Sequence, residues 1–140
     1  MSALPGIPAY PDGALTTILR DALPGVTVET QQAPDLDDRT PYVALRVSNG
    51  SLDLSLNLVN ATVTFDAWAR PSKRAAWTLA GQTLAALINA WREQTLTPDG
   101  YIKYIDTGGD LPQETRLAGQ AADLFHYTWT VDIGVRSPES

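Results

Sequence analysis

The sequence predicts an α+β fold in which a largely antiparallel β-sheet carries one short and one long α-helix on one face. Three observations lead to this prediction. Several segments alternate apolar and polar residues, as strands do. Residues 12–22 and 72–94 instead space their apolar residues as helices do. The two helical segments do not alternate regularly with the strands, so a parallel βαβ sheet is not expected.

Length and composition fit one domain spanning residues 1–140, with loose segments expected at 1–11 and 137–140. The chain has no cysteine, which excludes zinc ribbons, cysteine nucleophiles and disulfide scaffolds. Its net charge of −6 is the wrong sign for general nucleic-acid binding. We expect neither a signal peptide nor a membrane span, which takes roughly 20 apolar residues, and therefore a protein made and kept in the cytoplasm.

The first helix is expected to be short and amphipathic. Asp12 is its predicted N-cap, because a carboxylate can accept hydrogen bonds from the free amides of a first helical turn. Apolar residues follow at helical spacing until Pro24-Gly25 ends the segment. A short strand at 26–30 and a polar, exposed loop at 33–41 follow.

The middle of the chain predicts strands with a change of phase. After a strand at 42–47, Asn49-Gly50 predicts a turn, because both residues tolerate a positive φ. Leucines then occupy alternate positions, but from residue 61 onward the apolar residues take the other set of positions. Either a bulge or turn lies near Asn60, or the leucine row faces a different partner. The candidate interface residues of this row are Leu52, Leu54 and Leu56.

The second half predicts one long helix followed by strands. The helix runs from about Ser72 to Gln94, after the break at Arg70-Pro71. A strand is expected at 101–105, a long loop at 107–122 and a last strand at 125–135, which alternates most cleanly. The apolar stripe expected to bury the helix comprises Trp77, Ala80, Leu84, Leu87, Ile88 and Trp91.

Few residues offer catalytic or metal chemistry. The single histidine, His126, is expected to be a solvated or interface residue, with Asp132 or a nearby threonine as an alternative partner. Gly108-Gly109-Asp110 lacks the Lys-Ser/Thr pair and the helix of a phosphate-binding loop, so a flexible turn is the preferred interpretation. We therefore predict no enzyme activity, no metal site and no cofactor.

Three acidic residues, Asp35, Asp37 and Asp38, cluster in the polar loop. They resemble a fragment of a calcium loop, but the central glycine is missing and Arg46 stands where the distal glutamate would be. A solvated acidic loop is the preferred interpretation. The same carboxylates are candidates for contact with another subunit.

Three basic residues, Arg70, Lys73 and Arg74, cluster at the start of the long helix, where cations oppose the helix dipole. Either they are exposed and screened, or they meet acidic groups of a neighbouring subunit or a nucleic-acid phosphate. The overall acidity of the chain favours a protein partner. Trp68 lies on an otherwise polar strand face, and is either an interface anchor or part of a covered sheet end.

The order of several short segments carries a family resemblance. These segments are Leu-Arg-Asp-Ala-Leu-Pro-Gly at 19–25, Pro-Tyr-Val at 41–43, Val-Thr-Phe-Asp-Ala-Trp-Ala at 63–69, Ala-Ala-Trp-Thr-Leu-Ala at 75–80, Gly-Tyr-Ile at 100–102 and Tyr-Thr-Trp-Thr-Val at 127–131. With them, the sequence resembles the tail terminator proteins of long-tailed bacteriophages over most of its length. None of the segments is a catalytic signature.

The resemblance implies an α/β fold with a sheet and two helices, and a hexameric ring at the head-proximal end of the tail tube in the virion. Such a ring stops polymerisation of the major tail tube protein and offers the surface that joins the tail to the head connector. DNA passes through its centre without specific binding.

Two hypotheses connect the residues to such a ring. The basic helix start and the acidic loop are expected to match in charge between neighbouring subunits, so charge reversal at Arg74 or Asp38 should weaken assembly. The polar sheet face with Asp66 and Asp132 is expected to border the lumen and repel DNA phosphate.

Alternative functions remain open at this point. A head-completion or connector protein of the same phage neck would show similar residue patterns. A small ligand-binding domain or small enzyme, with the 107–122 loop as a lid, would need convergent polar residues that the sequence does not show. A bacterial adaptor protein unrelated to phage is a third alternative.

Overall fold

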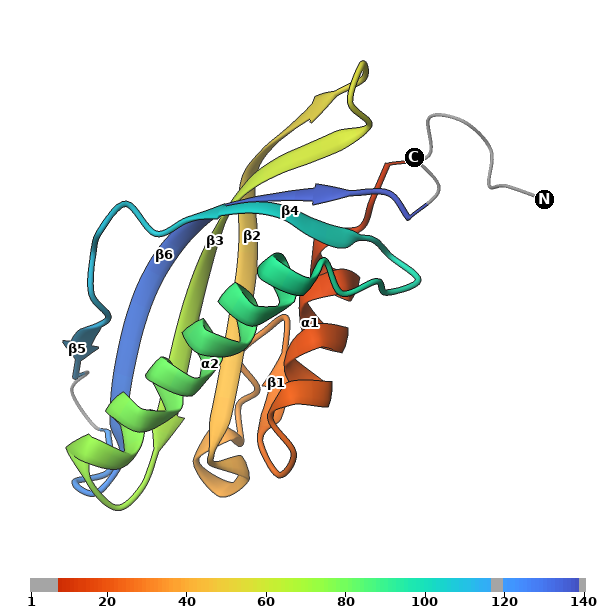
Figure 1. Cartoon of the computed structure of the whole chain (residues 1–140). Coiled ribbons are helices and arrows are strands. Elements are labelled where there is room, and N and C mark those ends of the chain that lie inside the picture. Colours follow the sequence, from red (N-terminus) through yellow and green to blue (C-terminus); the bar gives the residue numbers. More distant parts are fainter. Residues whose placement is uncertain (1–7, 117–119, 139–140) are drawn as a thin grey trace.

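The computed structural model, which describes residues 8–116 and 120–138, confirms the α+β prediction. Two helices lie on one face of a six-stranded sheet (Figure 1). The expectations for residues 1–7 and 139–140 lie outside the described residues. The elements are α1 (Pro11–Ala22), β1 (Thr27–Glu29), the 3-10 helix η1 (Leu36–Arg39), β2 (Tyr42–Asp53), β3 (Leu58–Ala69), α2 (Lys73–Glu93), β4 (Tyr101–Asp106), β5 (Gln113–Thr115) and β6 (Phe125–Arg136).

The sheet is largely antiparallel, as predicted. Its strand order is β1-β2-β3-β6-β4, with β5 paired to the first half of β6. Only β1 and β2 run parallel to each other. Strands β3 and β6 pair along their whole lengths, from Leu58 opposite Arg136 to Ala69 opposite Phe125. This long central pair fixes which residues face the helices.

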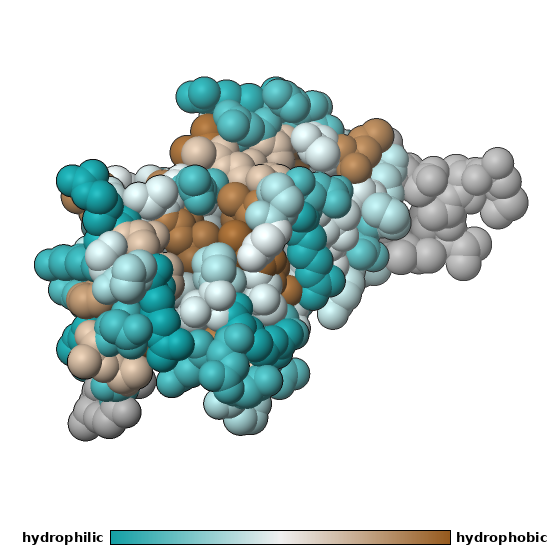
Figure 2. Space-filling model, turned by 90° about the horizontal axis from the view of Figure 1, so that it is seen from below, coloured by the Kyte–Doolittle hydropathy of each residue, from teal (hydrophilic) through white to brown (hydrophobic). Residues whose placement is uncertain are grey.

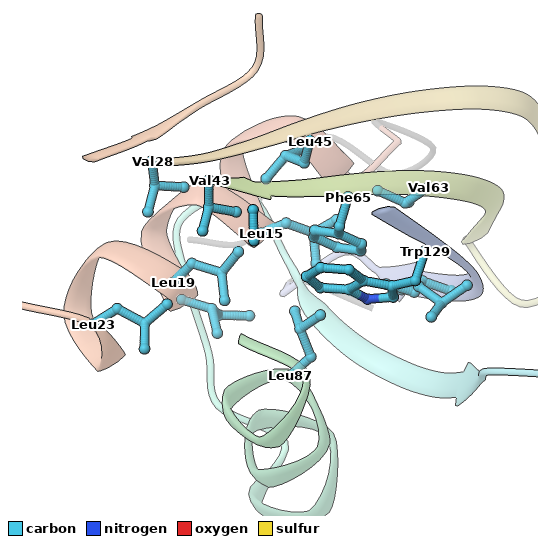
Figure 3. Packing of buried hydrophobic residues seen from close by; sticks show 14 of the residues in the cluster. Leu15, Leu19, Leu23, Val28, Val43, Leu45, Val63, Phe65, Leu87 and Trp129 are labelled. Atoms are coloured by element: carbon cyan, nitrogen blue, oxygen red, sulfur yellow. The ribbon is translucent and has the colours of Figure 1, made fainter. Parts of the chain in front are cut away.

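The main core lies between the sheet and the two helices (Figure 3). Leu15 and Leu19 of α1 and Leu87 of α2 are fully buried against it. At its centre Phe65 stacks on Trp129, with ring centroids 5.4 Å apart and planes 15° apart. Both rings come from the central pair of strands, where the predicted alternation places them.

Helix α1 begins two residues earlier than predicted. Its N-cap is Tyr10, without a side-chain cap, and Pro11 is the first helical residue. Proline suits this position, because an N–H in the first helical turn has no acceptor within the helix, so its absence costs no hydrogen bond. The φ of proline is also fixed near the helical value. Asp12 therefore lies inside the first turn, where its carboxylate complements the helix dipole. Pro11 is buried and does not belong to a loose segment.

Helix α2 has the predicted bounds, with Ser72 as N-cap accepting from the Ala75 amide at 3.1 Å. The predicted apolar stripe is wrong in part, because the helix is rotated so that its small residues face the sheet. Trp77 is 43% exposed, and its ring forms a T-shaped pair with that of Tyr127. The residues that α2 buries are Ala76, Leu79, Ala80, Thr83, Leu87 and Ala90.

The predicted turn at Asn49-Gly50 is wrong. Strand β2 continues through it with a bulge between Ser48 and Ser51, and the left-handed φ of 50° at Asn49 accommodates that irregularity. The chain reverses at 54–57 instead, between β2 and β3. This turn explains the change of phase, because the leucine row spans two strands.

The predicted loop at 107–122 is also wrong in part. It contains β5, whose Glu114 lies opposite Tyr127 of β6. The three-residue pairing extends the sheet on the side of β6 away from β3 and brings Glu114 close to the start of α2.

Gly134 of β6 lies under the ring of Tyr104, whose hydroxyl donates to Asn60 Oδ1 at 2.6 Å. A Cβ at position 134 would come within 2.1 Å of that ring. We expect Gly134→Ala to lower the free energy of unfolding by about 1–3 kcal/mol, as overpacking does. Urea denaturation would measure it.

Gly81→Ala is the matched control. Its Cβ would meet nothing within 4 Å, and it lies in the interior of α2. Alanine should stabilise the helix there by about 0.5–1 kcal/mol. Equal effects of the two substitutions would contradict the close approach of Tyr104.

Candidate assembly surfaces

An apolar hairpin extends beyond the body of the molecule where β2 passes into β3 (Figure 1). We call residues 49–60 the leucine hairpin. Leu52, Leu54 and Leu56 are 41%, 77% and 49% exposed, whereas Leu58 is buried. The three candidate interface leucines therefore lie together on an exposed tip.

The turn of the leucine hairpin is held by hydrogen bonds. Asp53 Oδ1 accepts from the Ser55 amide at 3.0 Å, the Ser55 hydroxyl at 2.7 Å and the Leu56 amide at 3.3 Å. The Ser55 hydroxyl holds the pKa of the Asp53 carboxyl below its usual value. Asn57 takes the left-handed conformation that closes the turn. The leucines are thus presented by an ordered turn.

A shallow groove separates the end of α1 from α2. Two hollows of about 470 and 440 Å³ share Val26 and Gln82 and form one depression along α2. Seen from below, hydrophobic residues gather in the middle of the molecule and hydrophilic residues surround them (Figure 2). We call this depression the interhelix groove; its lining includes Ala22, Val26, Ala75, Leu79, Gln82 and Ala86.

The basic helix start is largely neutralised within the subunit. Arg70 Nε lies 3.2 Å from Asp123 Oδ1, and Arg70 Nη1 donates to the Asp37 carbonyl at 2.8 Å. Lys73 Nζ lies 3.2 Å from Glu114 Oε1. Arg74 is exposed and forms no ion pair with any described residue. Neighbouring carboxylates thus offset the cost of placing cations at a helix N-terminus.

The acidic loop lies beside the basic helix start in the same subunit, joined to it through Arg70 and Asp37. Asp35, Asp37 and Asp38 are exposed as predicted; Asp35 is the N-cap residue of η1, and Asp37 and Asp38 lie within it. Within the described ranges, no group of three acidic or histidine side chains could hold a metal ion. Because the two charged patches adjoin within one subunit, part of their charge is matched there, and matching between neighbouring subunits stays a prediction.

Arg39 anchors this loop to β1. Its two terminal nitrogens donate to the Glu29 carboxylate at 3.1 and 2.7 Å, and the Tyr42 hydroxyl donates to Glu29 Oε1 at 2.6 Å. The Arg39 hydrogen bonds, with that of Tyr42, hold the pKa of the Glu29 carboxyl below its usual 4.5. No sequence pattern indicated this cluster, since its members lie far apart along the chain.

A lowered pKa in the folded state means that Glu29 contributes stability above the carboxyl's unfolded pKa and loses it as the pH falls through the folded one. We expect the Tm of the native protein to fall more steeply than that of Glu29→Gln between roughly pH 6 and pH 3. Thermal denaturation across this range measures the difference. Asp38→Asn, at an exposed carboxyl without an ion pair to described residues, is the control and should keep the pH dependence of the native Tm. If the Tm of Glu29→Gln falls with pH as steeply as that of the native protein, the stabilising role assigned to the Glu29 carboxylate is wrong.

His126 is buried, contrary to the prediction of a solvated residue. Its Nε2 lies 2.7 Å from Asp66 Oδ1, and its ring stacks on Trp68 at 4.2 Å. Trp68 is only 5% exposed and packs with Tyr42 and Leu124 in a second, smaller cluster. Of the two alternatives for Trp68, the geometry favours the covered sheet end. Asp66 is likewise occupied by His126 and does not lie on an open surface.

The sheet face away from the helices is polar where the second cluster does not cover it. Asp132 is exposed and accepts from the Thr62 hydroxyl at 2.9 Å. Thr64 and Thr130 lie opposite each other with their hydroxyls 3.4 Å apart. Of the two candidate lumen residues, Asp132 thus lies on this open sheet face. Of the helices in the described ranges, neither α1 nor α2 is long and apolar enough to cross a bilayer.

Comparison with known proteins identifies the family of the chain. A search of curated proteins finds no match. A family model described as phage tail termination protein matches residues 10–140, which takes in both helices, all six strands and the leucine hairpin. The chain therefore belongs to the phage tail termination protein family.

Proposed function

We propose that this protein forms a hexameric ring at the head-proximal end of the tail tube, stops polymerisation of the major tail tube protein and joins the tail to the head connector. The match of the family model to residues 10–140 carries the proposal. As a phage tail protein it is a component of the virion and associates with other tail and head-tail proteins. It acts through its surfaces, as a structural protein without a cofactor.

Exposed apolar residues support a role in assembly. Leu54 is 77% exposed at the end of an ordered hairpin, beside two further exposed leucines. Contiguous apolar surface on a folded protein marks sites of protein interaction. The leucine hairpin is therefore the first candidate for contact within the ring or with the tube.

The open sheet face supports a role at the DNA channel. We place Asp132 and the flanking threonines toward the lumen, where carboxylates and hydroxyls let DNA phosphate pass without binding it. The net charge of −6 suits the same role. Arg74, Asp37 and Asp38 stay candidates for contact with a neighbouring subunit, the tube or the connector, because their charges are not paired within the described parts of the subunit.

Electron microscopy of the purified protein with and without its tail tubes tests the proposal. Six-fold rings, and tubes capped at one end and stopped in length, are the expected results. Tubes that grow past the added protein, or density in the particle that lies only on the head side of the connector, would contradict it. The second outcome would identify a connector protein.

A further inference from the structure

We propose that the leucine hairpin of one copy docks in the interhelix groove of the next copy around the ring. This inference deepens the proposed function and rests on it, since it names the contact by which a ring of identical subunits closes.

The leucine hairpin presents an apolar surface that suits an apolar partner. Its three exposed leucines stand on a turn that Asp53 fixes, so little ordering is needed when they are buried. Between residues 47 and 65, Asp53 is the only charged side chain. A partner surface must therefore be apolar, with at most one cation opposite the tip.

The interhelix groove offers such a surface. Small and apolar side chains, among them Ala22, Val26 and Ala86, make up most of its lining, and polar side chains such as Gln82 and Asn89 lie along α2. It follows α2 from Ala75 to Asn89, about 20 Å at a rise of ~1.5 Å per residue. That length can receive the end of a two-stranded hairpin, whose strands lie about 5 Å apart.

The charges of the two surfaces are complementary. Arg74 precedes Thr78 and Gln82 at intervals of one helical turn, so it continues the α2 wall of the groove. Its guanidinium has no ion-pair partner among the described residues. Asp53 uses only Oδ1 for its own turn, which leaves Oδ2 for a partner. Arg74 of the next copy is the cation that fits.

The two surfaces lie at opposite ends of the subunit. The leucine hairpin forms the end of β2 and β3 at the top of Figure 1, whereas α1 ends and α2 begins at the bottom. A hairpin cannot reach the groove of its own subunit in this arrangement. Two different surfaces that fit each other are what head-to-tail contact requires, and such contact closes into a ring when the rotation permits.

Cysteine cross-linking tests the contact, and the absence of native cysteine makes every disulfide an introduced one. The variant Leu54→Cys/Ala85→Cys places one thiol on the hairpin tip and one on the groove. Under mild oxidation we expect a ladder of cross-linked copies, whereas a mixture of the two single variants should give only dimers. The control Leu54→Cys/Thr130→Cys puts the second thiol on the open sheet face and should give on the order of tenfold less product, since a disulfide needs close Cα atoms.

Capping of tail tubes by the same reduced variants reports separately on the proposed function. If the variants cap tubes but cross-link no better than the control, the docking inference is wrong and the proposed function stands. Disulfides between two Leu54→Cys tips, or a cross-link from the tip to the tube protein alone, would also overturn it. If tubes are never capped, the proposed function fails whatever the cross-links show.

Discussion

Phe65→Ala is expected to lower the free energy of unfolding by about 3–5 kcal/mol, the range for removing a buried aromatic side chain. Phe65 is fully buried at the centre of the sheet and stacks on Trp129 at 5.4 Å. Removing the Phe65 ring leaves a cavity beneath both helices, and the Trp129 ring loses the side chain on which it stacks. Because domains of this size are stable by only about 5–15 kcal/mol, a large share of the stability would be lost.

Thr64→Ala is the control for this change. Thr64 is the adjacent residue of β3, but it faces away from the helices and contacts Thr130 at 3.4 Å. We expect Thr64→Ala to lower the free energy of unfolding by about 1 kcal/mol or less, the range for losing one half-exposed hydrogen bond. Denaturant unfolding with an unchanged m-value would measure both variants. Similar losses at positions 64 and 65 would contradict the burial pattern that places the core on one face.

The double substitution Leu54→Asp/Leu56→Asp is expected to abolish ring formation and tube capping while leaving the subunit folded. Burying one leucine contributes about 1.5–3 kcal/mol. Losing two such contacts weakens association by on the order of a hundredfold or more at each interface. Carboxylates at the tip also cannot be buried without a partner. Sedimentation and electron microscopy of tubes measure the effect.

Leu111→Asp is the matched control, because Leu111 is 71% exposed on the segment between β4 and β5, away from the leucine hairpin. It should assemble as the native protein does. All three substitutions lie at exposed leucines, so the Tm should change little in either variant. If the double variant forms normal rings, the leucine hairpin is not part of the assembly surface.

Two local predictions from the sequence, the turn at Asn49-Gly50 and the burial of Trp77, are wrong because strand pairing or helix packing outweighs the local preference. Asn49-Gly50 has the composition of a turn, yet the pairing of β2 with β3 extends past it to Asp53 and Leu58. A continued ladder outweighs the local preference, which then appears as a bulge. Trp77 satisfies helical spacing, but the small side chains of α2 let that helix approach the sheet, and a rotation leaves Trp77 at the edge.

The sequence alone determined the fold class, the bounds of α2 and the alternation of β6. These features depend on periodicity and on capping residues, which act between neighbours in the chain. Only the tertiary structure decided that His126 meets Asp66, that Glu29 meets Arg39, and that Arg70 reaches the acidic loop. Such pairs are brought together by the register and packing of distant elements, and a pattern read along one strand or helix contains no information about them.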